Sequence, residues 1–209
     1  LWDMDGTLID SEPHWIRSER ELAAKHDAEW TEEDGKSLVG LSLDASSKIF
    51  IDKLGLNISS DEVTQALTTS VSEGLKQEII WRPGAKELLK ELKRKGVKTA
   101  LVTMSLRSMA LQVVEAIDFE AFDVVVAGDD VVYGKPNAEP YLKAAGLLGV
   151  DPKDCVAFED SISGILSAEA AGTKAVGIPN VMMIPAREDR ILWDTLEGKT
   201  LKDLRNLFK

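Results

Sequence analysis

The sequence predicts an α/β protein built on a doubly wound parallel sheet, with an all-helical segment inserted near its start. A strand-like apolar run opens the chain at residues 1–3. Residues 11–80 then show helical apolar spacing without any strand pattern. In the second half, short apolar runs alternate with helical segments, as strands and crossover helices do in a parallel sheet.

The expected elements follow in chain order. In the inserted segment, a helix is expected to start at Ser11-Glu12-Pro13, and further helices at 42–54 and 61–80, before Arg82-Pro83-Gly84 breaks the pattern. The rest of the chain predicts helices at 85–95, 108–117, 139–148, 162–171 and 201–208, and strands at 97–103, 123–127, 154–158 and 174–178. We therefore expect residues 1–10 and 82–209 to form an α/β domain and residues 11–81 a helical domain.

Composition limits the classes of partner. The chain carries 25 Lys and Arg against 36 Asp and Glu, a net charge of −11, which argues against nucleic acid or an anionic membrane as partner. The only cysteine, Cys155, excludes an intrachain disulfide and predicts a reducing compartment. No apolar run has the length of a membrane span, and we do not expect a secreted protein. We expect a cytoplasmic monomer or weak dimer that acts on a small molecule, with its first strand truncated.

Polar residues follow four of the expected strands. Because the carboxyl ends of parallel strands meet at one edge of the sheet, where ligands bind, we expect these side chains to lie together. They are Asp3, Asp5, Thr103, Ser105, Lys135, Glu159 and Asp160. Taken singly, each could be part of a solvated turn.

The pair Asp3 and Asp5 needs compensation for its charge. Two carboxylates about 4 Å apart repel by roughly 4 kcal/mol at an effective dielectric constant near 20. A divalent cation or a shared proton relieves this repulsion, and Mg²⁺ prefers carboxylate oxygens such as those of Asp3 and Asp160. Lys135 and Thr103 suit the oxygens of a phosphate group. The set therefore favours phosphoryl transfer.

These motifs resemble, in order, those of the haloacid dehalogenase-like (HAD) superfamily of phosphohydrolases. Asp3-Met4-Asp5-Gly6-Thr7 is similar to the first motif and Thr103 to the second. Lys135, in Gly134-Lys135-Pro136, is similar to the third, and Glu159-Asp160-Ser161 to the fourth. The resemblance spans nearly the whole chain. It implies a Rossmann-like core and a helical cap over the site, as in the β-phosphoglucomutase-like branch.

The resemblance also implies a role for each residue. Asp3 would be the nucleophile that forms an aspartyl-phosphate, and Asp5 the general acid and base. Mg²⁺ would be bound by Asp3, by the backbone carbonyl of Asp5 and by Asp160, with Glu159 as an accessory ligand. The expected catalytic residues also include Thr103 and Lys135. The expected phosphate-binding residues are Met4, Asp5, Thr103, Ser105 and Lys135.

The function implied is a Mg²⁺-dependent phosphatase of a small phosphorylated metabolite such as a sugar phosphate. Asp5 favours ester substrates, because a halide leaves without a proton. A phosphosugar mutase is the first alternative, although Leu43 stands where the mutases carry a phosphate-binding arginine. A receiver-like signalling domain that holds a stable phospho-aspartate is the second. Asp5 and the helical insertion argue against it.

Overall fold

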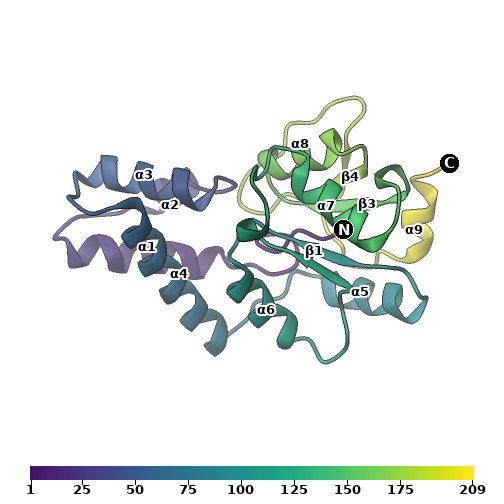
Figure 1. Ribbon diagram of the computed structural model, residues 1–209, viewed down its shortest axis with the longest axis horizontal. Helices are drawn as coiled ribbons and strands as arrows, with labels where there is room; N and C mark the ends of the chain where they lie inside the picture. Colours follow the sequence, from purple (N-terminus) through teal and green to yellow (C-terminus); the bar gives the residue numbers. More distant parts are fainter.

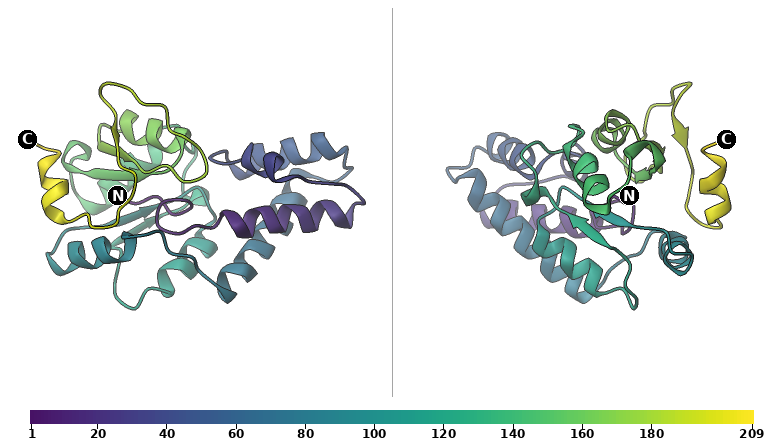
Figure 2. Two further views of the ribbon diagram at one scale, coloured as in Figure 1. Left: turned by 180° about the vertical axis from the view of Figure 1, so that it is seen from behind. Right: turned by 45° about the vertical axis from the view of Figure 1, so that its right-hand side comes forward.

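A computed structural model describes residues 1–209 and divides the molecule into a sheet-containing part and a helical part that projects from it (Figure 1). Figure 2 shows the helical part, in purple to blue, at one end of the molecule and the C-terminal helix, in yellow, at the other. None of the helices combines the length and the apolar character needed to cross a membrane.

The helical part contains four helices: α1 (Glu12–Lys25), α2 (Glu32–Lys36), α3 (Leu43–Leu54) and α4 (Ser60–Gln77). They enclose a small core of their own, centred on Leu22, Trp30 and Phe50. The expectation that the last helix runs to residue 80 is wrong. Glu78 is extended (φ −152°, ψ 133°), and its carbonyl faces the Nε2 atom of His14 on α1 at 3.0 Å.

The sheet-containing part alternates strands and helices as predicted. Its strands are β1 (Ala100–Val102), β2 (Val124–Val126), β3 (Val156–Glu159), β4 (Lys174–Gly177) and β5 (Ile191–Leu192). Its helices are α5 (Ala85–Arg94), α6 (Arg107–Glu115), α7 (Glu139–Leu148), α8 (Ile162–Ala170) and α9 (Leu201–Asn206), with 3-10 turns at Gly128–Asp130 and Pro152–Asp154. The predicted α/β class is confirmed.

Residues 1–3 lie in the middle of the sheet and join its two halves. β1 pairs with β2, and β3, β4 and β5 pair in that order, all in parallel. Trp2 forms parallel bridges with Leu101 on one side and Phe158 on the other. The sheet order is therefore β5–β4–β3–(1–3)–β1–β2, with the carboxyl ends of all strands at one edge.

Two strand predictions need correction. The strand expected at 97–103 begins only at Ala100, because the N–H of Val97 is bonded to the carbonyl of Leu92 and closes helix α5. The N–H of Thr99 is taken by the carboxylate of Asp123 at 2.7 Å. Strand β5 was not expected, because two residues are too few to produce an alternating pattern.

The sheet is covered on both faces, as side-chain alternation requires. Leu101 packs in one buried cluster with Trp2 and Phe158, whereas its neighbours Ala100 and Val102 pack in the other. The rings of Trp2 and Phe158 lie 4.6 Å apart between centroids. This packing fixes the strand ends, and with them the residues that follow each strand.

Candidate active site

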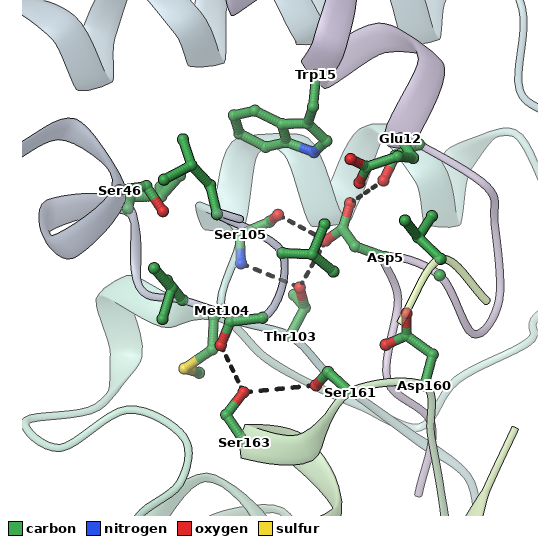
Figure 3. A pocket seen from close by; sticks show the side chains of 18 of the residues that line it. Asp5, Glu12, Trp15, Ser46, Thr103, Met104, Ser105, Asp160, Ser161 and Ser163 are labelled. Atoms are coloured by element: carbon green, nitrogen blue, oxygen red, sulfur yellow. Dashed lines mark hydrogen bonds between the residues drawn. The ribbon is translucent and has the colours of Figure 1, made fainter. Parts of the chain in front are cut away.

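A cavity of about 130 Å³ lies between the strand ends and the helical part. The residues after the strands that line it are Asp3, Asp5, Thr103, Ser105, Lys135 and Asp160. Helix α1 lines the opposite side (Figure 3). The cavity is therefore lined by residues that are far apart in the sequence.

Lys135 is bonded to two acids at the bottom of this cavity. Its Nζ atom lies 2.7 Å from Asp3 Oδ1 and 2.6 Å from Glu159 Oε1, and it donates to the carbonyl of Val102 at 2.9 Å. All three charged side chains are buried. Burial opposes the charge on Lys135, but the two carboxylates outweigh it and raise the pKa of the ammonium group. Lys135 therefore stays charged.

The acids outnumber this single cation. Burial raises the pKa of Asp3, which Lys135 offsets only in part, and it raises the pKa of Glu159 to about 7. Burial also raises the pKa of Asp160 well above its ordinary value, and the neighbouring acids add to the effect. The site therefore holds more buried acidic groups than Lys135 alone can neutralise.

The acidic cluster fits a hard cation. One carboxylate oxygen from each of Asp3, Glu159 and Asp160 lies within 4.8 Å of the others. Asp3 Oδ2 is buried and has no hydrogen-bond partner. Gly6 leaves room for Asp160, because a Cβ atom there would lie 1.9 Å from Asp160 Oδ2 and its φ is +82°. Divalent cations such as Mg²⁺ bind carboxylate oxygens, and here an unpartnered oxygen of Asp3 lies close to two further carboxylates.

Asp5 is held by three hydroxyl groups. Ser11 Oγ donates to its Oδ1 at 2.6 Å, and Ser105 Oγ and Thr103 Oγ1 donate to its Oδ2 at 2.7 and 3.2 Å. Thr103 Oγ1 also accepts from the N–H of Ser105 at 3.0 Å. Thr103 and Ser105 therefore contact Asp5 directly (Figure 3).

The remaining predicted residues, Met4 and Glu159, do not line the cavity. The side chain of Met4 is fully buried in the core, but the backbone N–H groups of Met4 and Asp5 donate to no other group of the protein. Glu159 lies behind Lys135 and accepts a hydrogen bond from the hydroxyl of Tyr141. Met4 can therefore act only through its backbone, and Glu159 contacts Lys135 directly.

The whole arrangement matches a known family. The family model described as haloacid dehalogenase-like hydrolase matches residues 1–178. The chain belongs to the haloacid dehalogenase-like hydrolases. The family predicted from the motifs is thus confirmed, and the protein is an enzyme of that family.

Several relatives of this hydrolase carry descriptive names. It is 32% identical to the phosphorylated carbohydrates phosphatase of Thermotoga maritima, over 84% of this chain and 82% of that protein. It is 30% identical to hexitol phosphatase B of Escherichia coli, over 86% and 82% of the two chains. The crystal structure of CbbY from Rhodobacter sphaeroides in complex with phosphate superposes with a TM-score of 0.85, at 28% identity over 98% of this chain and 97% of that one.

Four residues at the site of this hydrolase were missed from the sequence. Glu12, Trp15 and Glu19 on α1 line the cavity, and Tyr141 binds Glu159 from behind. The first three are spaced i, i+3 and i+7, which places them on one helix face. That spacing is a usable signal, because two acids beside an aromatic ring are unusual on a face directed inward. Nothing in the sequence indicated Tyr141.

Proposed function

We propose that the protein is a Mg²⁺-dependent phosphatase that hydrolyses a small phosphorylated metabolite such as a sugar phosphate. The observation that carries this proposal is the buried Asp3, with one oxygen bonded to Lys135 and the other unpartnered, at the bottom of a cavity shared with Asp5. The names of the relatives, which include phosphatases of phosphorylated carbohydrates and hexitols, support the same activity.

In the first step, Asp3 attacks the phosphorus atom. An Asp3 oxygen–phosphorus bond forms, and the ester bond to the leaving oxygen breaks with its electron pair. Lys135 orients Asp3 and offsets the charge that the phosphoryl oxygens bring into the cavity. The backbone N–H groups of Met4 and Asp5, which donate to no other group of the protein, supply further donors to those oxygens. The hydroxyl groups of Thr103 and Ser105 supply theirs only when they release Asp5.

Asp5 moves the protons. It gives a proton to the leaving oxygen, so that an alcohol departs instead of an alkoxide. It then removes a proton from a water molecule, which attacks the phosphorus atom and breaks the bond to Asp3. Three hydroxyl donors fix the Asp5 carboxylate near the reacting atoms.

The acidic cluster would hold the metal ion. We assign Asp3, Asp160 and the backbone carbonyl of Asp5 as ligands, with Glu159 as an accessory residue. When bound, Mg²⁺ supplies positive charge that stabilises the phosphoryl group and aligns it for attack. The excess of carboxylates over lysine supports this assignment.

Residues 11–81 act as a cap in this proposal, and residues 1–10 and 82–209 form the catalytic domain. The cap contacts the catalytic domain through Ser11 Oγ, which donates to Asp5, and through the carbonyl of Gly40, which accepts from Ser163 Oγ. Ser72 and Gln112 also bond between the two parts, at 2.6 Å between their side chains. In this proposal the cap moves away from the strand ends to admit substrate and closes over them to exclude water.

The test is turnover. Purified protein with Mg²⁺ is expected to release phosphate from p-nitrophenyl phosphate and from hexose or hexitol monophosphates, and EDTA is expected to stop it. Product analysis with β-glucose 1-phosphate distinguishes the mutase, because a mutase yields the 6-phosphate whereas a phosphatase yields free phosphate. A folded protein that hydrolyses no phosphomonoester would contradict the proposal.

A further inference from the structure

The helical side of the cavity contains no positive charge. Lys135 is the only cationic residue among those that line the whole cavity, and it lies at the strand ends, paired with Asp3 and Glu159. The helical side contributes two acids instead, Glu12 and Glu19 of α1. Any part of a substrate that extends beyond the phosphate site therefore enters a region lined by acidic side chains and by no cation.

Glu19 is a buried acid with one unsatisfied oxygen. It is only 5% exposed. Its Oε2 accepts a hydrogen bond from Trp30 Nε1 at 2.9 Å, and its Oε1 has no protein donor. Burial raises the pKa of Glu19 to about 7, although the bond from Trp30 opposes the rise. A carboxylate oxygen without a protein donor, on a buried residue in the wall of a cavity, is a position for a donor from a ligand.

Glu12 and Trp15 continue the same face of α1 towards the strand ends. Glu12 is half-buried, and burial together with the charges of Glu19, Asp10 and Asp5 raises its pKa to about 7. The indole N–H of Trp15 donates to no protein atom. Figure 3 shows Glu12 close to Asp5 and Trp15 beside it on α1, where the leaving group would emerge from the phosphate site.

We propose that Glu12, Trp15 and Glu19 bind an uncharged, hydroxyl-bearing leaving group, and that the two acids exclude substrates with a second anionic group. This inference rests on the proposed phosphatase activity. Hydroxyl groups can donate to both carboxylates, and the C–H face of a polyol can pack on the Trp15 ring. A second phosphate or carboxylate would be desolvated beside two acids, with no free cation to pair with it.

Matched substrates test the inference. Glycerol 3-phosphate and 3-phosphoglycerate are similar in size and differ in one carboxylate, and fructose 6-phosphate and fructose 1,6-bisphosphate differ in one phosphate. We expect kcat/KM to be at least about tenfold higher for the member of each pair whose only anionic group is one phosphate, because charge repulsion in a partly desolvated site disfavours a second anionic group. Equal values within both pairs, or a preference for the more anionic member, would overturn it.

Variants of the two acids test whether Glu12 and Glu19 cause this substrate preference. Glu12→Gln and Glu19→Gln are each expected to narrow the difference within a pair about threefold to tenfold, mainly through KM, because each removes one negative charge. Glu21→Gln is the control, because Glu21 is an exposed residue of the same helix that does not line this cavity. If neither Glu12→Gln nor Glu19→Gln narrows the difference, these acids do not set specificity.

A binding measurement separates this inference from the proposed function. Failure to hydrolyse p-nitrophenyl phosphate and every other ester would contradict the phosphatase proposal alone. Calorimetric titration of the Asp3→Asn protein with the glycerol 3-phosphate pair does not depend on turnover. Tighter binding of glycerol 3-phosphate supports the inference, whereas equal or tighter binding of 3-phosphoglycerate overturns it.

Discussion

The two sides of the cavity differ in how many protein contacts hold Asp5 and Lys135 at the strand ends and Glu19 and Trp15 on the helical side. At the strand ends, Asp5 accepts three hydroxyl hydrogen bonds, and Lys135 contacts two carboxylates and a carbonyl. On the helical side, Glu19 accepts one hydrogen bond and the indole N–H of Trp15 makes none. Groups that react must already be in place, whereas groups that recognise a substrate must stay free to bond with it.

The largest expected effect comes from Asp3, at the strand ends. Asp3→Asn removes the nucleophile while keeping the shape of the side chain, so kcat is expected to fall by about 10³-fold or more. Phosphate release from p-nitrophenyl phosphate measures it. Asp118→Asn, at an exposed position, serves as the control. A near wild-type rate for Asp3→Asn would show that another residue is the nucleophile.

Removal of Lys135 should damage the fold as well as the activity. Lys135→Ala leaves Asp3 and Glu159 buried without their cation, which costs on the order of 3–5 kcal/mol of unfolding free energy. Urea denaturation measures this loss, with Lys202→Ala on the exposed side of α9 as the control. Unchanged stability would mean that the acids are neutral when Lys135 is absent.

Two glycines test how tightly the strand ends are packed. In Gly164→Ala the added Cβ would lie 1.8 Å from Glu159 Oε2, so we expect a loss of about 3 kcal/mol. Gly146→Ala, in α7, meets nothing within 4 Å and is expected to gain about 0.5–1 kcal/mol. Thermal unfolding of both variants gives the comparison, and similar melting temperatures would show that Glu159 moves aside easily.

On the helical side, Glu19 should make the stability of the protein depend on pH. Because burial raises the pKa of Glu19 from 4.5 to about 7, the folded state binds its proton more tightly than the unfolded state does. The contribution of Glu19 to stability is therefore greatest below about pH 4.5, decreases as the pH rises towards 7, and changes little above that. Glu19→Gln should remove this decrease, which is at most about 3 kcal/mol.

Urea midpoints at pH 5 and pH 8 measure this effect, with Glu21→Gln as the control. The wild-type protein and the control should lose stability between the two values by more than Glu19→Gln does. An identical loss in all three proteins would show that Glu19 titrates as an ordinary surface acid.

The strand-end side could be predicted from the sequence because two simple patterns define it. Asp3, Thr103 and Asp160 each follow an apolar run, and parallel strands end at one edge. The helical side could not be predicted in the same way. Its helices were expected, but the direction in which α1 leaves the sheet depends on packing between residues far apart in the sequence.

Local bonding also overrode local propensity. Residues 97–99 read as strand, yet their backbone groups complete the end of α5 and bind Asp123. Tyr141 looked like an ordinary residue of an apolar helix face, and only the close approach of α7 to β3 brings its hydroxyl to Glu159. In both cases the deciding partner is remote, so a single sequence does not reveal it.

The bridges made by Trp2 link assembly to activity. Within the sheet, β1 and β3 meet only through residues 1–3, whose partners Leu101 and Phe158 come about 100 and 160 positions later. Asp3 therefore reaches its working position only after almost the entire polypeptide has been recruited. A nascent or partly folded chain would carry Asp3 without Lys135 beside it, and so could not hydrolyse the substrate until folding is complete.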